Sequence, residues 1–145
     1  MVFLSNETET KISPIFWKSR TIPQVCKSAK DAESRALDMC AEDAWYLAGV
    51  THELLTGSKG RGQLEVVVKC DNLGVKDSLN TTKQVDNKKL RPIIQCIKDM
   101  GLKKEIAAVQ WVRSEDCHAD LLTKKGAKGA EKILKMFRTG RNVDC

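Results

Sequence analysis

The sequence lacks the features that define several protein classes. Its 145 residues contain no apolar run near the ~18 residues that a membrane-spanning helix needs. The opening residues, MVFLSNETETK, have an apolar start but no basic segment ahead of it, so we expect no secretory signal. Internal repeats and low-complexity stretches are also absent. With 41% hydrophobic and 30% charged residues, the chain fits one soluble globular domain without a membrane partner.

Two kinds of site are missing as well. The six cysteines, at positions 26, 40, 70, 96, 117 and 145, include no CxxC pair, which argues against a zinc site and a disulfide framework. Reduced thiols predict a cytoplasmic protein, with the nucleus as the alternative. The glycine-rich segment GSKGRGQ (57–63) lacks the GxxxxGK[ST] spacing of a phosphate-binding loop. We therefore predict no nucleotide site there.

Positive charge is concentrated near the C-terminus. The formal net charge is +6, and residues 124–141 hold seven basic residues and one acid, which accounts for the whole excess. A basic segment attached to a neutral body indicates a polyanionic partner. A solvated helix face is the equally good alternative.

Hydrophobic periodicity predicts an α/β chain. Two strands (2–6 and 12–18) form a hairpin, with Pro14 at an edge or bulge, and a long helix follows from Ser28 to Thr56. Ser28 with Asp31 gives this helix a capping-box-like start. Its predicted inward face consists of Glu33, Ala36, Leu37, Cys40, Ala44, Leu47 and Leu54. A buried strand (64–70), two helices (73–79 and 90–100) and a strand (105–112) come next. The predicted inward residues of the second of these helices are Leu90, Ile93, Ile94 and Ile97. A short helix opens at Asp120, and a final helix occupies about 129–138, with Ile133, Leu134 and Phe137 as its apolar side. Since the order is β β α β α α β α α, we expect a mixed sheet flanked by helices.

Three acids lie at or near the ends of these elements. Asp71 follows the strand 64–70 directly, where α/β sheets bind ligands at the carboxyl ends of their strands. Glu33 lies in the first turns of the long helix, on the same predicted face as Leu37 and Cys40. Asp120 opens the short helix. A carboxylate that points inward needs a partner or a metal, although a rim Glu33 paired with Arg or Lys is an alternative.

Three segments together resemble a known family. They are WKSRT (17–21) with AESRALDMCAEDAWYL (32–47), then VVVKCDN (66–72), then VRSEDCHADLLTKKG (112–126). Their order and spacing are similar to the ribonuclease H domain at the C-terminus of copia-type retrotransposon polyproteins. The resemblance implies a ribonuclease H-like domain over 1–126, followed by a basic C-terminal helix and tail over 127–145. It implies hydrolysis of RNA in RNA–DNA hybrids, and the reverse-transcriptase region of the same polyprotein as a partner.

The resemblance also implies a metal site. Family members hold two magnesium ions with four carboxylates, and the matching residues here are Glu33, Asp71 and Asp120, with Mg²⁺ (or Mn²⁺) as cofactor. Mg²⁺ prefers hard oxygen ligands at ~2.1 Å, and two ions ~4 Å apart can hold the attacking water and the leaving oxygen. Contacts with the nucleic acid are expected from Asn72 and from the basic residues Lys124, Lys125, Lys128, Lys132 and Lys135.

The chain departs from the family at its start. The family's first carboxylate lies on a strand ahead of the hairpin, whereas Met1 falls at the second strand. The only acids among residues 1–30 are Glu7 and Glu9, in the hairpin turn at the wrong end of the strands. We therefore expect a ribonuclease H-like sheet without its first strand, exposed hairpin edges and impaired hydrolysis. Such a chain is a piece of a longer polyprotein or a decayed copy.

Two other functions stay open. The chain could be a non-catalytic remnant that at most binds nucleic acid, or a small α/β interaction module with a basic tail. The second leaves the three acids unexplained. His118, two residues before Asp120, is expected at the rim of the site, with a role in product release as the less favoured alternative. Trp17, Trp45 and Trp111 are expected in the core, with base-stacking platforms as the less favoured alternative. An Asx turn is the alternative role for Asn72.

Overall fold

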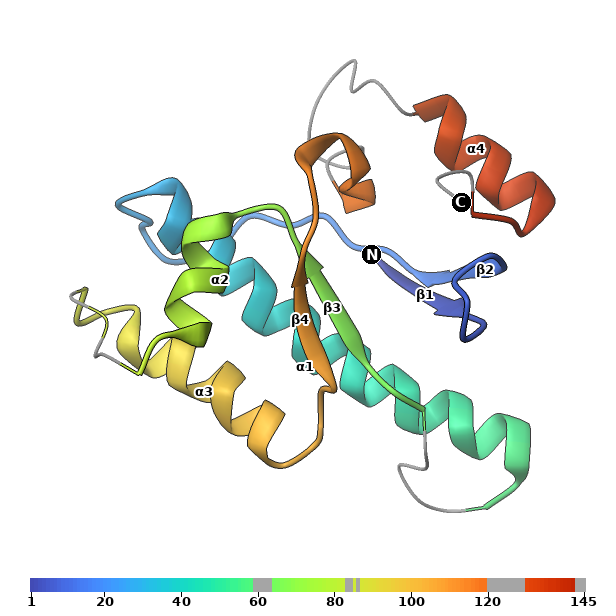
Figure 1. Cartoon of the computed structure of the whole chain (residues 1–145), viewed down its shortest axis with the longest axis horizontal. Coiled ribbons are helices and arrows are strands. Elements are labelled where there is room, and N and C mark those ends of the chain that lie inside the picture. Colours follow the sequence, from blue (N-terminus) through green and yellow to red (C-terminus); the bar gives the residue numbers. More distant parts are fainter. Residues whose placement is uncertain (59–63, 83–84, 86, 120–129, 143–145) are drawn as a thin grey trace. The chain divides into compact units, whose positions relative to one another are not determined.

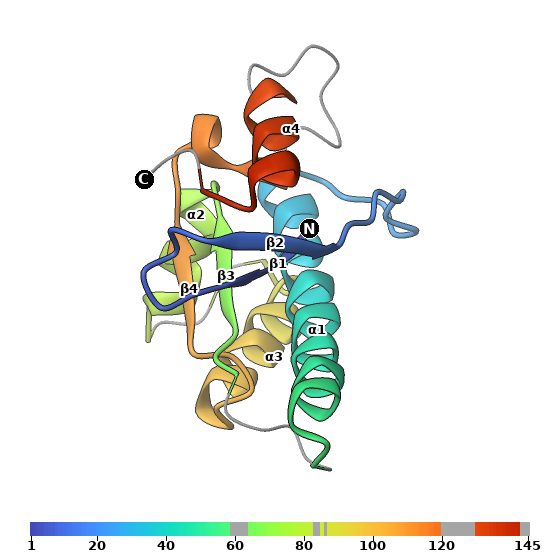
Figure 2. The same cartoon turned by 90° about the vertical axis from the view of Figure 1, so that its right-hand side faces the viewer.

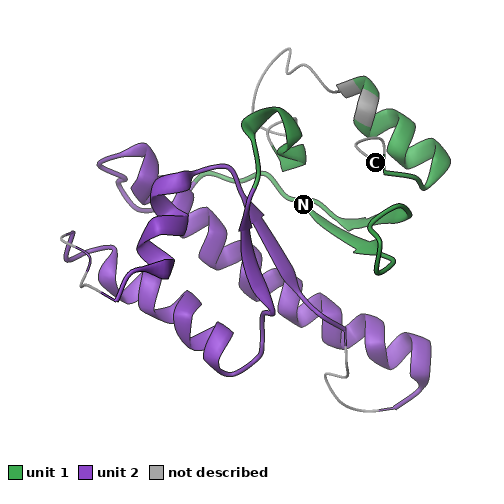
Figure 3. Ribbon diagram, viewed as in Figure 1, with its two compact units in different colours: residues 1–21, 112–145 green, residues 22–111 purple. Residues whose placement is uncertain are grey.

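The computed structural model describes residues 1–58, 64–82, 85, 87–119 and 130–142 of the chain. These residues belong to two compact units (Figure 3). Unit 1 combines 1–21 with 112–145, and unit 2 is the continuous segment 22–111. The domain boundary expected at residue 126 lies outside the described residues and stays a prediction.

Unit 1 contains the predicted hairpin. Strands β1 (Val2–Ser5) and β2 (Ile12–Phe16) pair antiparallel and lie side by side in both views (Figure 1 and Figure 2). Val2 pairs with Phe16 but Phe3 pairs with Pro14, so β2 carries one extra residue between these two pairs. Proline cannot donate to a ladder, which explains the bulge at this point and confirms the expectation for Pro14.

The C-terminal helix α4 (Ala130–Thr139) packs against this hairpin. Ile133 and Met136 are buried with Ile12 of β2. The apolar side expected from the sequence was only partly right, because Leu134 and Phe137 are 53% and 44% exposed. Met136 takes the inward position that was assigned to these two residues. Residues Ser114–Asp116 form a single 3₁₀ turn earlier in the unit.

Unit 2 is built on two parallel strands, β3 (Val67–Cys70) and β4 (Ala108–Trp111), with Val68 opposite Val109. Three helices pack on them: α1 (Ala29–Thr56), α2 (Leu73–Asn80) and α3 (Arg91–Leu102). Figure 1 shows α1 running the length of the unit across both strands. The shared core draws on β3, on all three helices and on the residues just ahead of β3 and β4, namely Leu37, Ala41, Val66, Val68, Cys70, Val75, Ile94, Ile97, Met100 and Ile106.

Strand β3 is buried on one face only. Val66, Val68 and Cys70 are at most 9% exposed, whereas Val67 is 38% exposed. The prediction of a buried strand therefore holds for one face of β3 and not for the face of Val67. Val68 packs in one core with residues of all three helices, so the helices cover this face of β3. The β-branched run Val66–Val68 had concealed this alternation.

The buried row of α1 is shifted by about one position along the helix from the predicted row. Ser34, Leu37 and Ala41 are buried, while Ala36 is exposed and Leu54 is 81% exposed. Small residues in this row let the helix approach the core closely. Glu33 consequently lies beside the buried row and is half-buried.

The observed class is α/β, as predicted. In the described residues the strands form two separate two-stranded sheets, one antiparallel and one parallel, where one mixed sheet was expected. No described helix is long and apolar enough to cross a membrane.

Candidate metal-binding and nucleic-acid-binding residues

Asp71 stands where the sequence placed it, directly after the last residue of β3. Its backbone carbonyl accepts a hydrogen bond from Trp111 Nε1 at 3.0 Å, which ties the end of β3 to the end of β4. Asn72 is the N-cap of α2, and its Oδ1 accepts from the backbone N–H of Val75 at 3.2 Å. This bond to the third residue on is a helix N-cap, whereas an Asx turn would bond two residues on, and the cap fixes the backbone next to Asp71.

Glu33 comes from the second turn of α1, an element adjacent to Asp71. The first turn of α1 lies close to the first turn of α2: a Cβ added at Gly74 would be 3.7 Å from Lys30 Cδ. Glu33 follows Lys30 by three residues, and Asp71 precedes Gly74 by three. Two of the three candidate acids are therefore presented by neighbouring element ends of unit 2. Their side chains are both half-buried.

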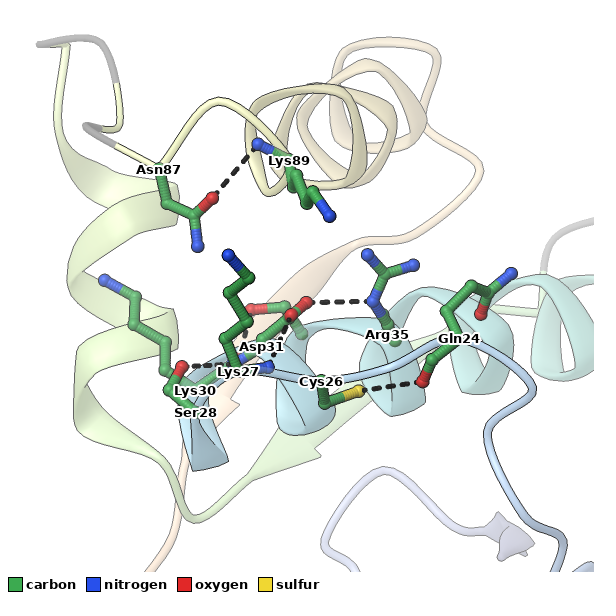
Figure 4. Close-up of polar contacts among 10 residues, drawn as sticks. Gln24, Cys26, Lys27, Ser28, Lys30, Asp31, Arg35, Asn87 and Lys89 are labelled. Atoms are coloured by element: carbon green, nitrogen blue, oxygen red, sulfur yellow. Dashed lines mark hydrogen bonds and ion pairs between the residues drawn. The ribbon is translucent and has the colours of Figure 1, made fainter.

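The structure buries a different carboxylate, Asp31, which is 1% exposed. Figure 4 shows its hydrogen bonds: Oδ1 accepts from Arg35 Nε at 2.8 Å and Oδ2 accepts from the backbone N–H of Lys27 at 3.3 Å. Its own N–H donates to Ser28 Oγ at 3.2 Å, which confirms the predicted helix cap. The Arg35 hydrogen bond lowers the pKa of Asp31 against the opposing effect of burial. Asp31 is therefore a charged structural group.

Sequence reasoning used Asp31 only as a capping residue and missed its burial. The available signal was the spacing of Asp31 and Arg35, an i, i+4 acid–base pair on one helix face. A carboxylate in such a pair can be buried because the guanidinium neutralises its charge. Glu33 has no basic residue four positions further on, since Leu37 stands there.

The remaining candidate residues fall mostly outside the described part of the chain. Asp120, Lys124, Lys125 and Lys128 are among the residues not described, as is the side chain of Lys132. Lys135 is described and is exposed on α4. Within the described residues there is no group of three His, Cys, Asp or Glu side chains that could hold a metal. Glu33 and Asp71 form an incomplete set without Asp120.

His118 is half-buried and has two contacts within unit 1. Its Nδ1 lies 2.9 Å from the backbone oxygen of Asp116, and its ring meets Phe3 edge to face with centroids 5.6 Å apart. The nitrogen hydrogen-bonded to this carbonyl donates, which fixes the ring orientation. These contacts hold the ring within unit 1, and the place of His118 at the rim of the site stays a prediction because Asp120 lies outside the described residues.

Only one of the three tryptophans is in the core. Trp45 packs against the core of unit 2, as expected. Trp111 is 41% exposed and Trp17 is 56% exposed, so the core assignment of these two was wrong. Trp111 is the last residue of β4, and Trp17 follows the last residue of β2. Strand ends have neighbours on fewer sides than strand centres, which leaves large rings uncovered.

Asp38 of α1 carries an energetic cost that can be tested. Its Oδ1 is buried and has no hydrogen-bond partner among the described residues. Burial, followed by the charge of Glu42, raises the pKa of Asp38. A raised folded-state pKa means that ionisation at neutral pH destabilises the fold. We expect Asp38→Asn to raise the Tm by a few degrees at pH ~7 and by nothing below pH ~4, where the wild-type carboxyl is protonated.

Thermal melts of the exposed-site control Glu53→Gln, on the same helix, should match the wild type at both pH values. A lower Tm for Asp38→Asn at neutral pH would mean that the Asp38 carboxylate has a stabilising partner.

The chain was compared with known proteins in three ways. No family model, no curated protein and no solved structure matches it.

Proposed function

We propose that this chain is a ribonuclease H-type domain of the copia-type retrotransposon class, in which Glu33, Asp71 and Asp120 bind Mg²⁺ or Mn²⁺. Its ligand would be an RNA–DNA hybrid. Bound metal would supply activation of water and charge stabilisation at the scissile phosphate. The chain's own residues position the metal, and the lysines of the C-terminal segment attract the phosphates.

One observation carries the proposal: Asp71 closes β3 beside the first turn of α2, which lies against the first turn of α1. Acids on the ends of packed elements have a rigid frame, and carboxylate oxygens are the donors that Mg²⁺ prefers. The buried ion pair of Asp31 with Arg35 and the Asn72 cap hold the two element ends in place. These contacts support a fixed site.

The resemblance matches three carboxylates of this chain, namely Glu33, Asp71 and Asp120, where family members use four. We therefore propose that hydrolysis by these three carboxylates alone is impaired.

Metal binding tests the site independently of hydrolysis. We expect the chain to bind Mn²⁺, and Asp71→Asn to weaken that binding about tenfold, because affinity follows the number of charged ligands. Free Mn²⁺ is measured by electron paramagnetic resonance during titration. The matched control is Asp77→Asn, an exposed aspartate of α2, which should bind as the wild type does.

A labelled RNA–DNA hybrid with Mg²⁺ tests the reaction. We expect very little cleavage by the 145-residue chain, because three carboxylates do not complete a two-metal site. Efficient cleavage that Asp71→Asn abolishes would overturn the impairment and leave the ribonuclease assignment in force. Mn²⁺ binding that is absent, or equal in the wild type and Asp71→Asn, would overturn the metal site. The chain would then be a non-catalytic remnant or a nucleic-acid-binding module.

A further inference from the structure

An exposed aromatic pair lies on unit 1. The rings of Trp17 and Phe137 meet edge to face, with centroids 5.8 Å apart and planes at 87°. Trp17 is 56% exposed and Phe137 is 44% exposed. Leu134, one helical turn before Phe137, is 53% exposed. We call Trp17, Leu134 and Phe137 the aromatic patch.

The edge-to-face contact holds the pair in a defined arrangement. A T-shaped pair is favourable beyond the area that it buries, so the rings restrain each other although neither is buried. Helix α4 is itself fixed on β2 by Ile133 and Met136. The patch is thus a preformed apolar surface with little motion to lose on binding.

Basic residues flank the patch along the chain. Lys18 and Arg20 follow Trp17, while Lys135, Arg138 and Arg141 follow Leu134 and Phe137, and all five are exposed. The one acid of α4 is Glu131. A fixed aromatic pair flanked by cations is the combination that binds single-stranded nucleic acid, with bases stacked on the rings and phosphates on the cations.

We propose that the aromatic patch binds single-stranded nucleic acid through base stacking on Trp17 and Phe137. A duplex hides its base faces, so this surface favours an unpaired strand. A lipid surface is the competing partner for basic aromatic helices. It fits less well because α4 has only ten residues and its inward apolar residues, Ile133 and Met136, are already buried in the protein.

None of these residues belongs to the carboxylate set, and binding here needs no metal. The inference takes only the nucleic-acid partner class from the proposed function. Binding assays in EDTA therefore separate the two proposals: loss of Mn²⁺ binding and hybrid cleavage leaves this surface untouched, and loss of single-strand binding leaves the metal site untouched.

The experiment measures fluorescence anisotropy of a labelled oligothymidylate of about 15 nucleotides, in EDTA, with the full chain. We expect Trp17→Leu to weaken binding about tenfold, because one stacked base is lost while a similar apolar side chain remains. Trp17→Phe should retain most of the affinity. Arg138→Gln should lower the slope of affinity against salt, which Trp17→Leu should leave unchanged.

Tyr46→Leu is the matched control, since Tyr46 is 64% exposed on α1 and lies in unit 2. It should bind as the wild type does. Equal binding by Trp17→Leu and the wild type overturns the proposal, provided that both melt at the same temperature. A duplex of the same sequence that binds as tightly as the single strand also overturns it. So does Trp17-dependent binding to phosphatidylserine vesicles without binding to the oligonucleotide, which would assign the patch to a lipid surface.

Discussion

Replacement of Asp31 by asparagine is expected to lower the Tm clearly and to leave Mn²⁺ affinity unchanged. The carboxylate is 1% exposed and is held by Arg35 Nε at 2.8 Å. An amide keeps the shape but loses the charge, which leaves the Arg35 guanidinium with no carboxylate at that contact. Truncating one member of a buried pair is destabilising for this reason. Differential scanning calorimetry and Mn²⁺ titration of the folded variant measure the two quantities.

Glu33→Gln is the matched variant two residues further along α1, with the opposite expectation. Glu33 is half-buried, so the Tm should stay close to that of the wild type while Mn²⁺ affinity falls about tenfold. If Asp31→Asn weakens Mn²⁺ binding and Glu33→Gln does not, Asp31 is the metal ligand of α1. The structural role assigned to Asp31 would then be wrong.

The pH dependence of stability gives an independent check on Asp31. Arg35 lowers the pKa of Asp31, so the folded state binds its proton less tightly than the unfolded state does. This contribution to stability is complete above the unfolded pKa of about 3.9 and is lost as pH falls through the lower folded value. The difference in Tm between Asp31→Asn and the wild type should therefore be smaller below pH ~4 than at neutral pH. Asp38, whose pKa is raised, has the opposite slope.

The sequence predicted where helices and strands lie better than it predicted which of their faces are buried. The hairpin, the Ser28 cap and the inward residues of α3 follow from local rules, namely turn chemistry, capping and a 3.6-residue period, and all three are confirmed. In α1 the predicted row was wrong because it followed Ala36 and Cys40, whereas the small residues Ser34 and Ala41 are the ones that are 0% exposed. Close packing selected their small size. Periodicity of apolar residues does not detect such a selection.

The candidate site was predictable only in part. Asp71 at the end of β3 follows from the boundary of a β-branched run, which is a local signal. The charge of Asp31 is stabilised mainly by Arg35, four residues away, and least by Lys89, which comes from a distant part of the sequence. Trp17 follows the last residue of β2 and is 56% exposed, although its size and its place near a strand suggested the core. The Lys89 contribution and the exposure of Trp17 depend on the folded arrangement, which the local pattern does not report.

Substitution of Ile97 by alanine is expected to cost about 2–5 kcal/mol in the free energy of unfolding. Ile97 of α3 is 2% exposed and belongs to the same core as Leu37 of α1 and Val68 of β3. Removing its side chain leaves a cavity under the two elements that present Glu33 and Asp71. Urea unfolding followed by circular dichroism measures the loss. Leu102→Ala, at an 81% exposed position of the same helix, should stay within about 0.5 kcal/mol of the wild type.

This substitution also distinguishes a scaffold effect from a site effect. Ile97 carries no metal-binding group, so the folded fraction of Ile97→Ala should keep wild-type Mn²⁺ affinity when it is measured in the cold, without denaturant. The apparent affinity should fall only in proportion to the unfolded fraction. A loss of Mn²⁺ affinity in a fully folded Ile97→Ala variant would mean that packing in this core sets the relative positions of Glu33 and Asp71. The site would then depend on the spacing of α1 and β3, and conservative changes at Leu37 or Val68 should alter metal affinity in the same way.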